Sequence, residues 1–208
     1  MAETFRSDCR ACPRLTSFLA EVKSSHPDYF CAPVPAFGDA SPQLLIVGLA
    51  PGLHGANRSG RPFTGDYAGI LLYQTLFDLG LSNQPVSESI DDGLVLKGVR
   101  ITNAVKCLPP QNKPETAEIR QCNSYLKAEL AALPDDCRLL ALGKIAHDAV
   151  LRAYGLPLGA LKFAHGATHR LPDGRLLTDS YHCSRYNTQT GRLTATMFRE
   201  VFEKSLDR

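Results

Sequence analysis

Four short apolar segments, each followed along the chain by a helical segment, constrain the fold of this 208-residue chain more than any other feature. We expect strands at 44–47, 99–105, 138–142 and 176–181. The helices expected between and after them cover 67–80, 114–133, 145–154 and 193–206, with apolar side chains at helical spacing. Strands that alternate with helices of this length indicate a parallel sheet covered on both faces. The sequence therefore predicts an α/β fold.

The other segments are expected to connect or flank these elements. Leu15, Phe18, Leu19 and Val22 recur at helical spacing in the first thirty residues. Residues 31–42 are rich in proline and are expected to be irregular, 82–93 form a polar loop, and 157–175 form a Gly/His-rich connector that can hold a hairpin. We find no internal repeat and expect a single domain over residues 1–208.

The bulk composition excludes several classes of protein. Hydrophobic residues make up 44% and charged residues 21% of the chain, as in ordinary globular domains. The net charge of +2 gives no overall basic field, so any binding of nucleic acid must use a local patch. No segment approaches the length of a membrane span, and residues 1–12 lack the apolar core of a signal peptide. We expect a cytoplasmic protein with no membrane partner.

Four of the seven cysteines have the spacing of a metal site. Cys9 and Cys12 form a C-x-x-C pair, Cys107 follows the second strand, and Cys122 lies on the next helix. Four thiolates from two distant pairs suit a tetrahedral zinc ion or an iron–sulfur cluster, and the wide second spacing favours the bulkier cluster. A thioredoxin-like redox pair would lie between a strand and a helix, whereas Cys9 and Cys12 precede every expected strand, so this alternative is disfavoured. The remaining cysteines, which we expect to be structural, are Cys31, Cys137 and Cys183.

Three loops that follow strands carry the polar side chains best suited to chemistry. The loops 48–66, 106–113 and 182–191 are expected to converge, because the carboxyl ends of parallel strands share one edge of the sheet. They bring together Asp66, Asn112, His182 and Asn187, with Asn103 on the strand below. The segment Gly48–Gly52 and the nearby ring of Phe63 suit a flat ligand, because glycine lets the backbone approach it closely. No G-x-S-x-G elbow, phosphate loop or G-x-G-x-x-G fingerprint is present. The other histidines of interest, His54, His147, His165 and His169, are expected to be structural.

These motifs together resemble the uracil-DNA glycosylase superfamily, specifically its iron–sulfur family 5 (type B) branch. The resemblance covers Cys9, Cys12, Cys122 and the segments 48–52, 60–66, 106–114 and 182–192. Leu49 stands where the related family 4 has an acidic residue, which points to family 5. The resemblance implies a three-layer αβα sandwich with a central four-stranded parallel sheet. It also implies a structural [4Fe–4S] cluster on Cys9, Cys12, Cys107 and Cys122.

The resemblance implies hydrolysis of the N-glycosidic bond of uracil in DNA, and of other deaminated bases such as hypoxanthine, by base flipping that leaves an abasic site. Phe63 resembles the ring that stacks on the flipped base. Asp66 matches the carboxylate that positions water and offsets the sugar cation, and Asn112 matches an amide that helps to hold that water. His182 and the backbone N–H groups near Leu49 would donate to the uracil oxygen that gains charge.

Asn103 departs from the branch, whose members often have a small residue there, and resembles the family 4 amide that reads the pyrimidine edge. We therefore expect a stronger preference for uracil; the alternative is that Asn103 only caps a strand end. The resemblance places Arg185, Tyr186 and Asn187 in a wedge that enters the duplex. Candidate phosphate contacts, for which solvated surface charge is the alternative, are Arg58, Lys113 and Arg192.

We expect a monomeric enzyme that acts on DNA. A second hypothesis is a non-catalytic iron–sulfur or zinc protein that binds DNA through the same fold. The presence of Asp66, Asn112 and His182 speaks against that loss of chemistry. A third is a family member whose main lesion is hypoxanthine or another deaminated purine.

Overall fold

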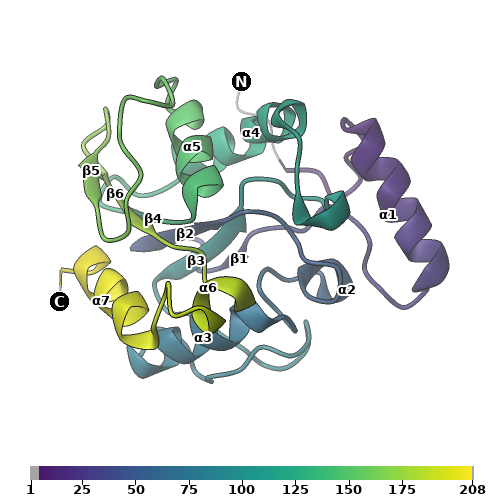
Figure 1. Cartoon of the computed structure of the whole chain (residues 1–208), viewed down its shortest axis with the longest axis horizontal. Helices are drawn as coiled ribbons and strands as arrows, with labels where there is room; N and C mark the ends of the chain where they lie inside the picture. Colours follow the sequence, from purple (N-terminus) through teal and green to yellow (C-terminus); the bar gives the residue numbers. More distant parts are fainter. Residues whose placement is uncertain (1–4, 208) are drawn as a thin grey trace.

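The sheet has six strands in the computed structural model, which describes residues 5–207 (Figure 1). The strands are β1 (Phe37–Gly38), β2 (Leu44–Gly48), β3 (Val99–Asn103), β4 (Arg138–Leu142), β5 (Thr168–Arg170) and β6 (Leu176–Ser180). Their order is β1-β3-β2-β4-β6-β5, with the four inner strands parallel and the two edge strands antiparallel to their neighbours. The predicted four-stranded parallel sheet is confirmed as the centre, but the whole sheet is mixed and two strands wider.

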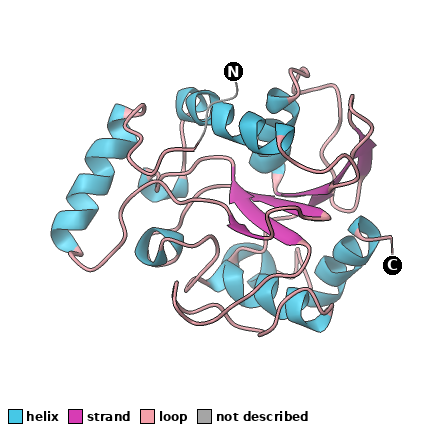
Figure 2. Ribbon diagram, turned by 180° about the vertical axis from the view of Figure 1, so that it is seen from behind, coloured by secondary structure: helices cyan, strands magenta, loops and turns pink. Residues whose placement is uncertain are grey.

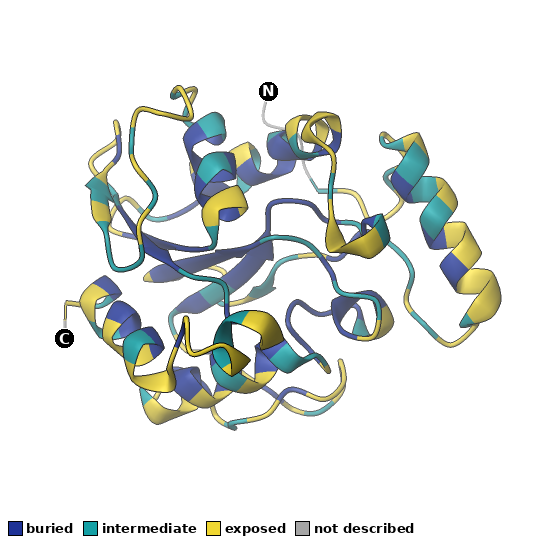
Figure 3. Cartoon of the chain, in the orientation of Figure 1, coloured by how far each residue is buried: buried dark blue, intermediate teal, exposed yellow. Residues whose placement is uncertain are grey.

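The central strands are buried on both faces, which explains their unbroken apolar sequences. Leu44 and Ile46 face the layer formed by α3 (Tyr67–Asp78) and α7 (Ala195–Ser205). Leu45 and Val47 face the opposite layer, formed by α4 (Thr116–Ala131) and α5 (Lys144–Ala153). Figure 2 shows the sheet between these helical layers, and Figure 3 shows the inner strands as the most continuously buried part of the molecule. The three-layer αβα sandwich is thereby confirmed.

The two edge strands complete segments that were expected to be connections. β5 lies in the 157–175 connector and pairs with β6, so the hairpin joins the connector to the expected fourth strand instead of lying within the connector. β1 was not expected, because proline dominates the 31–42 segment, yet Phe37 and Gly38 pair with Ile101 and Arg100. Gly38 has a φ of +117°, and a Cβ there would lie 2.3 Å from the Val99 carbonyl oxygen, so this edge pairing requires glycine.

Short helices occupy the loops that follow the strands. They are α2 (Ala56–Ser59), the 3₁₀ turn η1 (Pro110–Asn112) and α6 (Arg185–Gln189), while α1 (Pro13–Ser25) lies beside the sandwich (Figure 1). β3 ends at Asn103, two residues before the expected end. The N–H groups of Ala104 and Val105 both donate toward the β2 side, to the carbonyls of Gly48 and Leu49, so the alternation of a strand is broken there.

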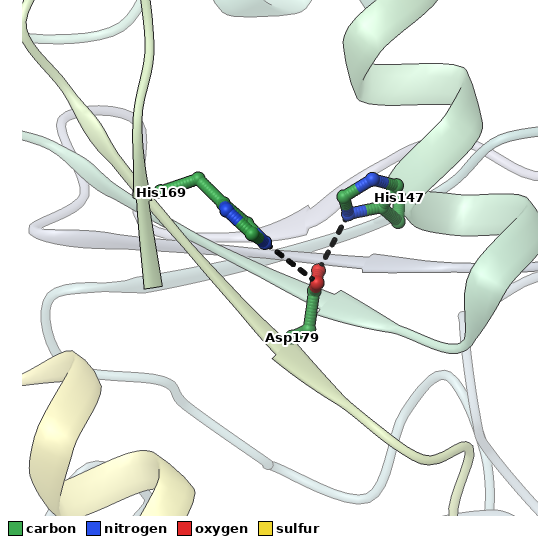
Figure 4. A group of neighbouring side chains, drawn as sticks. All are labelled: His147, His169 and Asp179. Carbon is green, nitrogen blue, oxygen red and sulfur yellow. Dashed lines mark hydrogen bonds and ion pairs between the residues drawn. The ribbon is translucent and has the colours of Figure 1, made fainter. Parts of the chain in front are cut away.

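A buried network of two histidines and one carboxylate ties α5, β5 and β6 together (Figure 4). His147 Nδ1 lies 2.8 Å from Asp179 Oδ1, and His169 Nε2 lies 3.1 Å from Asp179 Oδ2. His147 Nε2 lies 3.1 Å from the Leu161 carbonyl oxygen, so both nitrogens of this ring face acceptors, an arrangement that favours the doubly protonated ring. Burial lowers the pKa of His147. The hydrogen bond to Asp179 and the charge of that carboxylate raise the pKa by more than burial lowers it, so the net change is upward.

The predicted structural role of the other histidines fits their contacts. His54 Nδ1 lies 2.8 Å from the Tyr29 hydroxyl, and His165 Nδ1 accepts from the Tyr181 N–H at 3.1 Å. Over residues 5–207, no helix is both long and apolar enough to cross a membrane.

Candidate active site

A cavity of about 440 Å³ opens at the carboxyl ends of β2, β3 and β6. It brings together every residue that sequence analysis assigned to catalysis or base binding: Leu49, Phe63, Asp66, Asn103, Asn112 and His182. The rest of its wall comes from Ala50, Gly52, Ala56, Tyr67, Ala68, Ser184 and Arg185. A concave site at this edge is where open α/β sheets bind ligands.

Phe63 forms an aromatic wall that depends on a glycine. Its ring stacks on that of His182, with centroids 5.9 Å apart and an angle of 28° between the planes. A Cβ on Gly48 would lie 2.7 Å from Phe63 Cζ and 2.3 Å from Asn103 Oδ1. Gly48 therefore allows both side chains to approach the end of β2. Phe63 itself has a φ of 54°, a left-handed conformation that costs a non-glycine residue energy and must be held by its surroundings.

Asp66 caps α3 and lies against the glycine-rich loop. Its Oδ1 accepts the Gly69 N–H at 2.8 Å, as an N-cap side chain does. A Cβ on Gly55 would lie 2.5 Å from Asp66 Oδ2, so this loop closely surrounds the second oxygen. Burial raises the pKa of Asp66, and the N–H groups of Gly69 and Ala68 partly oppose that rise. The carboxylate is thus partly desolvated and fixed in direction by the helix.

His182 is a neutral ring held from within its own loop. Burial lowers its pKa to about 4, so at neutral pH it can donate one hydrogen bond without carrying charge. Its carbonyl accepts from Asn187 Nδ2 at 2.8 Å. Ser184 caps α6 by accepting from the Asn187 N–H at 3.4 Å. Asn187, predicted in a DNA wedge, is half-buried and its side chain supports the His182 loop.

Asn103 has an unused hydrogen-bond acceptor in the cavity wall. The residue is 3% exposed, and within residues 5–207 its Oδ1 has no hydrogen-bond partner. A buried polar atom left unpaired costs about 1–3 kcal/mol, so this atom suits a ligand donor. This observation disfavours the alternative that Asn103 only caps a strand end. Asn112 is exposed and has a φ of 55°, a left-handed conformation that asparagine tolerates.

The basic residues predicted to contact DNA lie on exposed positions. Arg185 lies over the Tyr67 ring at 5.0 Å, and Arg192 lies over the Tyr181 ring at 4.4 Å. Tyr186 is 70% exposed, which a residue that inserts into a partner requires. Arg58 and Arg185 line a second groove, of about 620 Å³, beside the cavity, and Lys113 follows Asn112.

The four predicted cluster cysteines meet in a separate pocket between α1, residues 105–107 and α4. Cys9, Cys12, Cys107 and Cys122 all line it. Burial raises the pKa of Cys107 to about 12, with further contributions from the three other thiols, and burial raises that of Cys122 to about 11. A bound metal group would supply the positive charge that four neighbouring thiolates need.

Four sulfurs that line one pocket are a donor set suited to a zinc ion or an iron–sulfur cluster. In the part of the chain that the structure describes, the one set of three Cys, His or acidic ligand atoms within 4.8 Å of one another is His147, His169 and Asp179. A tetrahedral zinc site with Zn–S bonds of about 2.3 Å requires sulfurs about 3.8 Å apart. The Lys106 N–H also donates to Cys122 Sγ at 3.3 Å, a contact typical of cluster sulfurs.

The other cysteines have structural surroundings. Cys137 and Cys183 are fully buried in the two apolar cores, and Cys31 Sγ accepts from Asn57 Nδ2. Sequence analysis assigned no role to Tyr67 or Ser184, which line the cavity. Their position next to Asp66 and within the His182 loop was the available signal.

Comparison with known proteins agrees with this geometry. A family model described as "Uracil DNA glycosylase superfamily" matches residues 35–205, and the chain therefore belongs to that superfamily. A type-5 uracil-DNA glycosylase of Thermus thermophilus is 50% identical over 93% of this chain and 90% of the relative. One of Pyrobaculum aerophilum, also type 5, is 43% identical over 95% of this chain and 88% of the relative. A type-4 enzyme of Archaeoglobus fulgidus is 29% identical over 66% of this chain and 62% of the relative. Within the superfamily, the chain falls in the type-5 branch.

Proposed function

We propose that this cavity is the active site of a DNA-repair glycosylase, which hydrolyses the N-glycosidic bond of uracil in DNA. The observation that carries the proposal is the convergence of Phe63, Asp66, Asn112 and His182 on one cavity, in a chain whose relatives are named uracil-DNA glycosylases. Such an enzyme must extrude the nucleotide from the duplex before it can reach the bond. We also propose that the enzyme acts as a monomer, since Phe63, Asp66, Asn112 and His182 give a single chain a complete set of groups for the proposed reaction.

Each side chain has a role that its surroundings support. As the bond between C1′ and N1 breaks, the sugar gains positive charge and uracil takes the electron pair as an anion. Phe63 stacks on the base, and neutral His182 donates a hydrogen bond to the oxygen that gains charge. Ionised Asp66 stabilises the sugar cation and accepts a proton from the water that attacks C1′. Asn112 holds this water at the cavity rim.

Asn103 gives the proposed site its selectivity. Asn103 lines the cavity and no described residue bonds its Oδ1; in the proposed complex this atom would accept the N3–H of uracil and Nδ2 would donate to O4. Hypoxanthine has a similar edge with one N–H and one carbonyl, but its ring system is larger. In the same cavity, its edge would therefore not align with the Asn103 amide. We propose that the enzyme removes uracil in preference to hypoxanthine.

The four clustered cysteines would hold a [4Fe–4S] cluster. Bound there, it would supply a covalent cross-link between residues 9–12 just before α1, residues 105–107 and α4, and no catalytic step. Arg14, on α1, already donates two hydrogen bonds of 2.7 Å to Glu118, one turn before Cys122 on α4. Metal analysis of the purified chain should find about four irons per chain. A single zinc per chain would contradict this assignment.

Cleavage of labelled duplexes tests the proposed function. Duplexes that carry one uracil, one hypoxanthine or no lesion are incubated with the metal-loaded chain, and alkali then breaks the strand at any abasic site. We expect scission at uracil and none in the unmodified duplex. Scission at hypoxanthine alone would favour the purine-specific alternative. Tight binding to every duplex without scission would favour the non-catalytic DNA-binding protein.

A further inference from the structure

A buried arginine next to Phe63 connects the active-site loop to a distant segment. Arg61 is 1% exposed. Its Nε donates to Thr64 Oγ1 at 2.9 Å, and its Nη2 donates to Ser87 Oγ at 2.7 Å and forms an ion pair with Asp92. Its guanidinium also lies 4.9 Å from the centre of the Phe37 ring on the edge strand β1. A charge buried this completely requires partners, and every one of these contacts fixes its direction.

Asp92 organises the segment 87–94 around this arginine. Its carboxylate accepts the N–H groups of Glu88 at 2.8 Å, Ser89 at 3.3 Å and Leu94 at 3.0 Å. Burial opposes ionisation, but Arg61 and these N–H groups hold the pKa of Asp92 well below its usual range. The segment that the sequence presents as a polar loop is therefore an ordered support centred on one ion pair.

The support reaches the loop that carries Phe63 and Asp66. The Gly65 N–H donates to the Ser87 carbonyl at 3.0 Å, and the hydroxyls of Thr64 and Ser87 lie 2.6 Å apart. Tyr73 on α3 donates to the Pro62 carbonyl at 2.7 Å. These bonds surround Phe63, whose left-handed backbone needs external restraint.

We propose that Arg61 and Asp92 form a brace that positions Phe63 and Asp66 for the reaction. None of residues 87–94 lines the active cavity, so the segment acts through Arg61 and the 60–66 loop. Arg61 is thus a positioning residue for the proposed glycosylase, on whose activity this inference rests. Small displacements of reacting groups can cost about a hundredfold in rate, so loosening the brace should slow the chemistry.

Arg61→Lys is the informative substitution. Lysine keeps the charge that pairs with Asp92, which avoids leaving a buried carboxylate alone. It lacks the planar fork, so it cannot hold Thr64, Ser87 and Asp92 together. Arg175→Lys is the matched control, because Arg175 is also buried and bonded, to the carbonyls of Leu130, Leu133 and Pro134, none of which lines the cavity.

The test compares single-turnover uracil excision with binding of an abasic-site duplex, below the unfolding temperature of every variant. Arg61→Lys should slow excision about tenfold to a hundredfold while the Kd for the abasic duplex changes less than about threefold. Arg175→Lys should lower the melting temperature but keep the excision rate. Excision by folded Arg61→Lys at the wild-type rate would overturn the proposal.

Amide hydrogen exchange reads the brace independently of activity. The Gly65 and Gly69 amides, bonded to Ser87 and Asp66, should exchange faster in Arg61→Lys and at the wild-type rate in Arg175→Lys. If the wild type excises no uracil, the proposed function fails and exchange alone decides the brace; unchanged protection would overturn it. If Arg61→Lys does not fold, Ser87→Ala is the second variant, because it keeps the ion pair between Arg61 and Asp92. It is expected to slow excision and to speed exchange of the Gly65 and Gly69 amides, both by less than Arg61→Lys. Wild-type rate and protection in Ser87→Ala would then refute the brace.

Discussion

Asp66 and His182 are titratable side chains of the cavity, and burial moves both toward their neutral forms. For His182 this means that the ring is neutral at physiological pH, and in the proposed reaction it would donate a hydrogen bond to the leaving base as a neutral group. For Asp66, the opposing N–H groups at the start of α3 limit the rise in pKa. The two groups can therefore be ionised carboxylate and neutral imidazole over the same pH range, as the proposed reaction requires.

The pH dependence of excision should reflect these shifts. Because the pKa of His182 is about 4, the excision rate should show no step near pH 6.5, where an ordinary histidine titrates. The rate should fall on the acid side as Asp66 becomes protonated above its usual range. The measurement is single-turnover excision against pH. A step near pH 6.5 that disappears in His182→Gln would contradict the assignment of a neutral ring.

Asn103→Ala should erode the preference for uracil. The variant removes the unpaired Oδ1 and opens space for a larger base, so excision of uracil should fall more than excision of hypoxanthine, by about tenfold in their ratio. Both rates are measured on otherwise identical duplexes. An unchanged ratio of the two rates would show that Asn103 does not read the base.

The sequence predicts which loops form the site, but not every contact that orders its residues. The convergence of Asp66, Asn112 and His182 follows from the position of three loops after three parallel strands. The role of Arg61 could not be predicted, because its partner Asp92 lies 31 residues away in a segment without periodicity. The unpaired Oδ1 of Asn103 is equally invisible to the sequence, since it depends on what the folded wall leaves unbonded.

At the scale of elements, the end of β2 determines the shape of the cavity. Gly48 is the last residue of that strand, and its lack of a side chain admits Asn103 from β3 and Phe63 from the next loop. Glycine is therefore required at position 48 for steric reasons, independently of any close approach of the backbone to a ligand.

Gly48→Ala should impair excision by displacing these two side chains. The added Cβ would approach Phe63 Cζ to 2.7 Å and Asn103 Oδ1 to 2.3 Å, distances that force the neighbours to move. We expect a loss of about tenfold or more in the excision rate. Gly159→Ala is the control, since a Cβ there meets nothing within 4 Å and its backbone needs no positive φ. Equal activity in both variants would contradict the steric role of Gly48.

Elements were predictable where burial and length define them. The bounds of β4 were predicted in full because a continuous apolar run ends at Gly143. The strand β1 and the helices α2 and α6 were missed, because elements of two to five residues depend on pairing and capping rather than on periodicity. Ser184, for example, caps α6 within a loop whose sequence carries no helical pattern.

At the scale of the whole molecule, the αβα sandwich follows from strict alternation of strands and helices, whereas the two antiparallel edge strands do not. The network of His147, His169 and Asp179 holds one of these edges to α5. Because this network raises the pKa of His147, it should make the free energy of unfolding depend on pH.

The sign of this dependence follows from the raised pKa of His147. A group whose pKa is higher in the folded chain stabilises it fully below its unfolded pKa of about 6.5, and that contribution is lost as pH rises through the folded value. Urea unfolding should therefore show that the stability difference between wild type and His147→Gln shrinks as pH rises above about 6.5. His54→Gln, at an exposed ring, is the control. A difference that grows with pH would contradict a protonated His147.

The most direct test of the proposed function is single-turnover uracil excision by Asp66→Asn. Asparagine keeps the side-chain oxygen that caps α3 and removes only the charge, so the fold should be retained. Asp78→Asn, at an exposed carboxylate near the other end of α3, is the control. We predict that the wild type and Asp78→Asn release uracil at similar rates and that Asp66→Asn is slower by about a hundredfold or more. Excision by Asp66→Asn at the wild-type rate would show that this carboxylate does not act in the reaction.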